Sequence, residues 1–174
     1  MYSTSYSTEN KEKGMGLDIS AYRKLEKVRD FTSEDEDYYA EGLVHVYPNN
    51  DFPGRFDGLD EKALYKPGES FGFRAGSYGV YNAWREWLAR LVGTTPNEAW
   101  AGFYHGPFAE LINFSDCEGT IGPVVAAKLA KDFAEWDDRA KGSAPADRAW
   151  NYEVYKDWRK AMEMAADNGA VDFH

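Results

Sequence analysis

Three long segments of the sequence place apolar residues at helical spacing, and this periodicity constrains the fold more than any other feature. They cover residues 79–92, 123–140 and 149–167. The apolar positions of the first are Trp84, Trp87, Leu88, Leu91 and Val92. Because each apolar stripe needs a surface to pack against, the chain is expected to build one core around about three main helices.

Shorter segments with strand patterns lie around these helices. Leu17, Ile19 and Ala21 alternate with polar residues, which predicts a strand that turns these three inward. Residues 42–47, 71–74 and 171–174 are further strand candidates, residues 59–66 form a short strand or turn, and residues 108–114 form a strand or a short helix. Residues 94–106 are expected to be a loop with one helical turn, and residues 141–145 a linker.

These elements predict a single α+β domain over residues 15–174, with a small, mostly antiparallel sheet packed against about three main helices. Residues 1–14 are polar and show no periodicity, so we expect a disordered tail there. Met15 follows directly and is a candidate for the true start of the protein.

Charge and composition exclude several classes of protein. The formal net charge of -10 argues against a nucleic-acid binder, which carries a basic face. No apolar run is long enough for a membrane span, and the N-terminus lacks the apolar core of a signal peptide. The one cysteine excludes an intramolecular disulfide and a multi-cysteine zinc site. We therefore expect a cytoplasmic protein without a metal or cofactor and without nucleic-acid or membrane partners.

The segment 32–41 is strongly acidic. It is interpreted as a solvated face, with Ser33 and Glu36 as a capping box for a short helix. It lacks the ligand spacing and the turn glycine of a calcium-binding loop.

The first candidate site is the turn Asp116-Cys117-Glu118-Gly119, which lies within residues 113–123 ahead of a helix. A helix N-terminus favours anions and lowers the pKa of a nearby thiol, so Cys117 is a candidate nucleophile. Such chemistry needs a base, and His105 is the better candidate of the two internal histidines. In the alternative interpretation, the two acids cap the helix, Cys117 packs, and the turn has no ligand.

The second candidate site is the turn from Arg74 to Gly79, with Tyr81 and Asn82 beyond it. Arg74 supplies charge, Ser77, Tyr78 and Asn82 supply hydrogen bonds, and Tyr78 or Tyr81 offers a ring for stacking. The turn could hold a phosphate at a helix N-terminus, although it lacks the Gly-Lys-Ser/Thr ending of a P-loop. The alternative is an ordinary turn with Ser77 as the N-cap.

Residues 68–72 match the letters Gly-x-Ser-x-Gly of a hydrolase nucleophile elbow. No strand is expected to lead into this segment and no helix directly out of it, so the context does not fit.

Four segments together resemble a family of phage and bacterial proteins whose activity is not established. They are Met15-Gly16-Leu17-Asp18-Ile19, Arg74-Ala75-Gly76-Ser77-Tyr78, Phe114-Ser115-Asp116-Cys117-Glu118-Gly119 and Gly169-Ala170-Val171-Asp172-Phe173-His174. The resemblance implies a phage or prophage setting and nothing about catalysis. Residues 2–14 precede the usual start of such proteins.

Three hypotheses about function follow. The first is a binder of a small molecule, with nucleotide-like ligands among the candidates, through which a phage modulates its host. The second is a small hydrolase-type enzyme in which Asp116, Cys117 or Glu118 acts with His105. The third is an acidic module that binds a host protein. The sequence does not decide whether the protein is an enzyme, and it leaves the ligand and the oligomeric state open.

Overall fold

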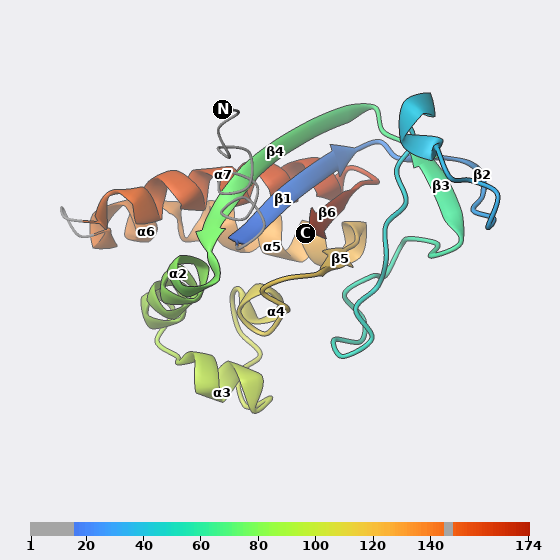
Figure 1. Cartoon of the computed structure of the whole chain (residues 1–174). Helices are drawn as coiled ribbons and strands as arrows, with labels where there is room; N and C mark the ends of the chain where they lie inside the picture. Colours follow the sequence, from blue (N-terminus) through green and yellow to red (C-terminus); the bar gives the residue numbers. More distant parts are fainter. Residues whose placement is uncertain (1–15, 145–147) are drawn as a thin grey trace, which may run out of the picture.

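A four-stranded sheet, in the order β4-β1-β6-β5, organises the structure (Figure 1). Its strands are β1 (Gly16–Arg23), β4 (Glu69–Ser77), β5 (Gly119–Ile121) and β6 (Ala170–Phe173). Every neighbouring pair is antiparallel. Strand β6 therefore lies between two strands that are far from it in the sequence.

The computed structural model describes residues 16–144 and 148–174. The expected tail at residues 1–14 and the candidate start Met15 lie outside the described residues.

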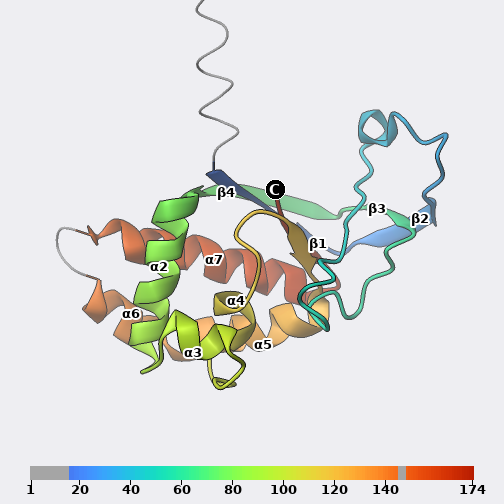
Figure 2. The same ribbon diagram turned by 60° about the horizontal axis from the view of Figure 1, so that its bottom comes forward.

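The helices lie on one face of this sheet (Figures 1 and 2). Helix α7 (Trp150–Ala166) packs on β1 and β6, and α5 (Pro123–Glu135) packs on α7. Helix α2 (Tyr78–Leu91) continues directly from β4. This arrangement confirms the predicted α+β class, with a small antiparallel sheet against three main helices.

Aromatic rings fill the space between sheet and helices. Trp158 of α7 is fully buried, and its ring centroid lies 5.8 Å from that of Trp84, 5.1 Å from that of Phe73 and 5.4 Å from that of Phe173. The side chains expected to face inward from the first strand do so: Leu17, Ile19 and Ala21 are at most 1% exposed. Burying rings of this size stabilises the fold strongly, because each removes a large apolar area from water.

The helix boundaries follow local chemistry, with one correction. The Ser77 hydroxyl accepts a hydrogen bond from the Val80 N–H and caps α2, and Pro123 occupies the first turn of α5, as predicted. The helix expected to run from residue 123 to 140 is interrupted at Trp136, where α6 (Asp137–Ser143) begins.

Tertiary contacts hold Asp137, the first residue of α6 after the interruption. The Asp137 carboxylate accepts hydrogen bonds from the Tyr152 hydroxyl at 3.1 Å and pairs with Arg159 at 3.5 Å, and both partners belong to α7. The linker expected at residues 141–145 was also wrong, because α6 continues to Ser143; Pro145 lies outside the described residues.

A second sheet of two strands, β2 (Glu26–Asp30) and β3 (Ala63–Lys66), extends beyond the first (Figure 2). The strand predicted at residues 42–47 was wrong. This segment forms only an isolated bridge, in which Val44 and Tyr65 exchange backbone hydrogen bonds of 2.8 and 2.9 Å. One alternating segment does not make a strand unless a partner edge stays beside it.

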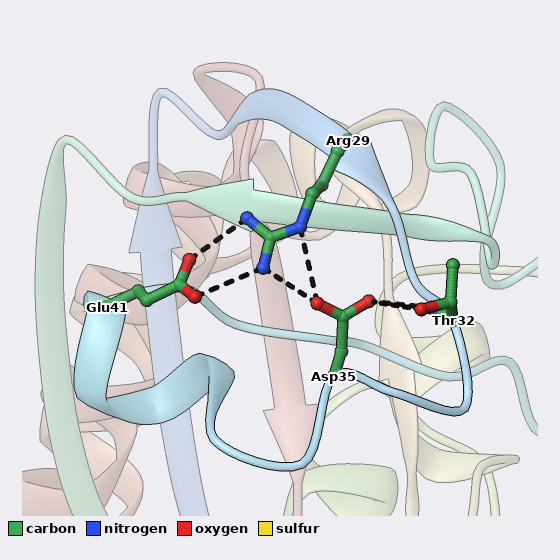
Figure 3. A network of polar contacts seen from close by, with 4 residues as sticks. All are labelled: Arg29, Thr32, Asp35 and Glu41. Carbon is green, nitrogen blue, oxygen red and sulfur yellow. Dashed lines mark hydrogen bonds and ion pairs between the residues drawn. The ribbon is translucent and has the colours of Figure 1, made fainter.

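Polar contacts hold the acidic segment 31–41 against β2 (Figure 3). The Arg29 guanidinium donates to both carboxylate oxygens of Glu41, at 2.9 and 3.3 Å, and to Asp35 at 2.7 Å. Asp35 also accepts from the Thr32 N–H at 2.7 Å. The short helix of this segment begins at Tyr38 with Asp37 as its N-cap, so the capping box predicted for Ser33 and Glu36 was wrong. Glu41 ends the short 3-10 helix η1 (Tyr38–Glu41), which the network therefore fixes in place.

Two short helices complete the structure. Helix α3 (Pro96–Trp100) is the one helical turn expected between residues 94 and 106. Helix α4 (Ala109–Ile112) resolves the ambiguous segment 108–114 as helical. In Figure 1, α3 lies below α2, and α4 lies beside α2 toward the centre of the molecule.

Candidate functional site

The turn at residues 113–118 is shaped by one hydroxyl group. The Ser115 Oγ atom accepts hydrogen bonds from the N–H groups of Cys117 at 3.2 Å and Glu118 at 3.1 Å. Gly119 then leaves the turn at a φ of +119°, and a Cβ at that position would lie 2.7 Å from the Cβ of Asn49. Both the conformation and the close approach require glycine there.

The sequence suggested that this turn leads directly into helix α5, but in the structure it does not. Strand β5 separates the two, and α5 begins after Gly122, which donates its N–H to the Arg55 carbonyl at 2.8 Å. A Cβ on Gly122 would lie 2.5 Å from the Asp57 carbonyl oxygen, so the 55–57 loop covers this helix N-terminus. The unpaired N–H groups of the α5 N-terminus, which were expected beside Cys117, therefore do not lie at the turn.

Two arginines and a tryptophan fix the carbonyl groups at the end of α4. Arg55 donates to the carbonyls of Glu110 and Asn113, at 3.1 and 2.9 Å. The indole N–H of Trp100 donates to the Ile112 carbonyl at 3.0 Å. A four-residue helix leaves most of its carbonyl groups without internal partners, and these side chains satisfy them.

The second of these arginines, Arg85, lies at the centre of the site and was missed by sequence reasoning. It is 3% exposed, and its guanidinium donates to the carbonyls of Ile112 at 3.0 Å and Phe114 at 2.6 Å. The available signal was its position on the apolar stripe of α2, next to Trp84. A charged side chain on a buried face needs hydrogen-bonding partners, which marks it as structural or functional.

A chain of hydrogen bonds runs from Arg85 to the turn. Arg85 donates to the Oδ1 atom of Asn82, and Asn82 donates through Nδ2 to the Oδ2 atom of Asp116 at 3.0 Å. Because the amide oxygen accepts from Arg85, the amide nitrogen must face Asp116. The Asp116 carboxylate is thereby held in one orientation.

These groups line a hollow of about 510 Å³ between α2, α3 and the 113–118 turn. Its wall includes Asn49, Asn82, Arg85, Trp100, Asp116 and Glu118. The Trp100 side chain is 51% exposed, and the Arg85 guanidinium lies 5.7 Å from the centre of its ring. The hollow thus combines a fixed aromatic surface with oriented hydrogen-bonding groups.

The structure brings together only part of the residues selected from the sequence. Asn82, Asp116, Cys117 and Glu118 all line the hollow. Tyr81 is fully buried behind it, with its ring centre 4.8 Å from the Arg85 guanidinium. Burial raises the pKa of the Tyr81 hydroxyl, an effect that Arg85 opposes.

The remaining candidates lie elsewhere. Arg74 pairs with Asp18 at 3.3 Å across β1 and β4, and Ser77 caps α2. Tyr78 follows at the start of α2, and none of these three lines the hollow. The residues of the predicted second site therefore do not act together. Only Asn82, one turn further along α2, lines the hollow beside the first candidate site.

The proposed nucleophile and its base are not paired. The Cys117 thiol is exposed, and its contact within the described residues is the Ser115 hydroxyl at 3.5 Å. His105 is exposed in the loop between α3 and α4 and does not line the hollow. Residues 68–72 overlap the start of β4 and form no strand-to-helix elbow.

The side chains that line the hollow beside the 113–118 turn carry more negative than positive charge. Asp51, Asp116 and Glu118 contribute carboxylates, and Arg85 is the single cationic side chain among the described residues of the wall. Since Arg85 is already engaged by three acceptor groups, it orients the wall more than it offers charge to a ligand. Within the described residues, no group of three or more histidine, cysteine, aspartate or glutamate side chains could hold a metal ion.

Comparison with known proteins adds no family. No protein-family model matches the chain, and searches of curated proteins and of solved structures find no match. Over residues 16–144 and 148–174, the helices are all too short or too polar to cross a bilayer.

Proposed function

We propose that this protein binds a small nucleoside-like molecule in the hollow beside the 113–118 turn. The observation that carries the proposal is the Arg85–Asn82–Asp116 chain, which holds a carboxylate ready at the wall that Trp100 also lines. A carboxylate fixed before binding loses little entropy when it accepts a ligand's hydrogen bonds.

Trp100 supports a planar ligand. Its indole is half-exposed yet held by the hydrogen bond to Ile112, so a ring that stacks on it does not have to order it first. Stacking of a nucleobase on an aromatic side chain contributes about 1–3 kcal/mol.

The acidic lining supports a ligand rich in hydrogen-bond donors and without phosphate. Asp116 and Glu118 accept hydrogen bonds well from ribose hydroxyls or base amino groups. The same carboxylates, with Asp51, repel a phosphate, and Arg85 alone does not outweigh them. Within the nucleotide-like class, the acidic wall therefore favours nucleosides over nucleotides.

We also propose a biological context for this binding. We infer a phage or prophage protein that acts in the host cytoplasm and modulates the host by binding such a ligand. Its support is the resemblance of the Arg74–Tyr78, Phe114–Gly119 and Gly169–His174 segments to phage and bacterial proteins.

Titration calorimetry with the four common ribonucleosides and their 5′-monophosphates tests the binding function. At least one nucleoside should bind more tightly than its monophosphate. Asp116→Asn should weaken that nucleoside roughly 10- to 100-fold, because a hydrogen bond to a charged acceptor is lost. Trp100→Ala should weaken it roughly tenfold through lost stacking.

Matched controls are available outside the hollow. Phe103 is 84% exposed and Glu135 is exposed on α5, so Phe103→Ala and Glu135→Gln should leave nucleoside affinity unchanged. Absence of binding by every nucleoside, or wild-type affinity in both the Trp100 and Asp116 variants, would contradict the proposal. Tighter binding of a monophosphate would contradict its charge argument.

A further inference from the structure

A second hollow, of about 470 Å³, lies on the other side of Glu118. One wall comes from η1 and the segment 45–50, and the other from β5 and the end of β6. Only Asn49 and Glu118 also line the nucleoside hollow. An inference about this second hollow therefore stands independently of the proposed function.

A largely buried carboxyl group lies in this hollow. Asp172 is the partner of Thr120 in the β5–β6 pair, and its Oδ1 atom accepts from the Thr120 hydroxyl at 3.2 Å. Burial raises the pKa of the Asp172 carboxyl to about 6, although His174 and Thr120 both act in the opposite direction. The folded chain thus leaves this carboxylate poorly compensated when it is ionised.

Exposed aromatic rings line the opposite wall. Tyr39 of η1 is 69% exposed and Tyr47 is 53% exposed. The Tyr47 ring lies 4.2 Å from that of His45, which stacks on Phe31 at 4.4 Å. Burial raises the pKa of the Tyr47 hydroxyl, and the charges of Tyr39 and Asp172, which line the same hollow, raise it further.

The charge pattern selects the kind of ligand. Asp172 and Glu118 line the hollow, and none of the described lining residues is a lysine or an arginine. The carboxylates and histidines of the described residues are not grouped closely enough to hold a metal ion. Carboxylates beside exposed tyrosine rings are suited to an organic cation, which the ring faces attract and the carboxylate pairs.

We propose that this second hollow binds a small organic ammonium ion, with the Asp172 carboxylate pairing its charge and the Tyr39 and Tyr47 rings forming its walls. The Arg29 network assists by position: its contact with Glu41 fixes the helical turn that carries Tyr39 (Figure 3). Glu118 adds a second negative charge at the border with the nucleoside hollow.

Cation affinity in the second hollow is expected to rise with pH. As pH rises, Asp172 loses its proton and gains the charge that pairs the cation. The other ionisable side chains that face the hollow are those of Glu118, His45, His174, Tyr39 and Tyr47, and deprotonation of an acid, an imidazolium or a phenol never adds positive charge. Every titrating group of the lining therefore favours a cation more at higher pH. If a bound cation restores an ordinary pKa to Asp172, affinity rises by roughly 30-fold between pH 4.5 and pH 8.

The test uses nuclear magnetic resonance titration of the full chain with choline, with putrescine as a primary amine, and with 3,3-dimethylbutan-1-ol, the neutral isostere of choline. At least one of the two cations should bind at pH 8, with shifts at Tyr39, Tyr47 and Asp172. The neutral isostere should bind more weakly by roughly tenfold or more, since it lacks the charge.

Variants separate charge from shape. Asp172→Asn keeps an acceptor for Thr120 but removes the charge, so cation binding and its pH dependence should both disappear. Tyr47→Leu lies at an exposed position and should weaken the cation severalfold without unfolding the domain, whereas Tyr47→Phe should not. Glu69→Gln, on the far edge strand, serves as the matched carboxylate control.

Three results would overturn the proposal: neither cation binds, the neutral isostere binds as well as choline, or Asp172→Asn retains wild-type cation affinity while folded. Nucleoside binding is unaffected by any of these, so the two proposals fail separately.

Discussion

The two sheets of this protein are held together in different ways. The four-stranded sheet is covered by helices and stabilised by large buried rings such as Trp84, Trp158 and Phe173. The two-stranded sheet covers a much smaller apolar cluster, which contains Leu25 and Val46, and relies on exposed ion pairs. Burial decides stability in the first region, whereas polar contacts decide position in the second.

This difference bears on where ligands are expected. Tyr39, His45 and Tyr47 belong to the segment that the smaller region supports, whereas Asp172 belongs to the larger sheet. The second hollow therefore joins a wall backed by the larger apolar core to a wall backed by the smaller one, and we expect the second wall to have the lower local stability.

The largest loss of stability is expected when a buried ring is removed from the larger core. Trp158→Ala should lower the free energy of unfolding by about 3–5 kcal/mol, because the cavity cannot be refilled. Urea unfolding followed by circular dichroism measures this. Phe103→Ala removes an exposed ring and should change stability by less than about 0.5 kcal/mol; similar losses in both variants would contradict the assignment of the core.

The variant Asp172→Asn tests the stability contribution of the carboxyl group in the second hollow, where the two regions meet. The folded pKa of Asp172, about 6, lies above its ordinary value of 3.8, so its contribution to stability is fully present below pH 4 and is lost as pH rises through 6. Over that range the wild type should lose about 3 kcal/mol relative to the variant. Urea unfolding at pH 4, 5, 6 and 7.5 follows the difference, and a constant difference would refute the shift.

The smallest effect is expected at the Arg29 network. Arg29→Met should leave global unfolding almost unchanged, since the side chain is exposed, but should speed amide hydrogen exchange in residues 31–41. It should also weaken cation binding in the second hollow by a fewfold. Unchanged exchange rates would show that the network does not hold the segment.

Asp172 and Asp35 distinguish the two regions because their carboxyl groups titrate in different pH ranges. Arg29 and the Thr32 N–H hold the pKa of Asp35 below 3.8, so its contribution is present above that value and is lost only in stronger acid. At pH 5 most Asp172 is protonated while Asp35 is still paired. Exchange in residues 31–41 should therefore stay slow at pH 5, where cation binding has already fallen.

Helices and their ends could be predicted from the sequence because their causes are local. The apolar spacing of α2 and α7, the Ser77 cap and the early Pro123 all act within one or two turns of chain. The break at Trp136 was not predicted; Asp137, the residue that follows it, contacts residues of α7 that lie 15 or more positions away. Residues 42–47 alternate as a strand does, but whether a partner edge exists is decided by distant residues.

The site was predictable only in part for the same reason. Asn82 and Asp116 were both selected from the sequence, but nothing local shows that they meet, since 34 positions separate them. Arg85 was hidden among the apolar residues of α2. Asp172 was part of a recognised segment, yet its role follows from its position on β6 next to Thr120.

The place of β6 in the sheet also has a consequence for the order of events in folding. Contacts such as Ser20 with His174 join positions 154 apart, so β1 and β5 are synthesised long before the strand that bridges them. Until β6 emerges, each presents an unpaired edge to other chains, and closing so long a loop slows the final step. We therefore expect nascent chains that end before residue 170 to be more prone to aggregation than chains that include β6.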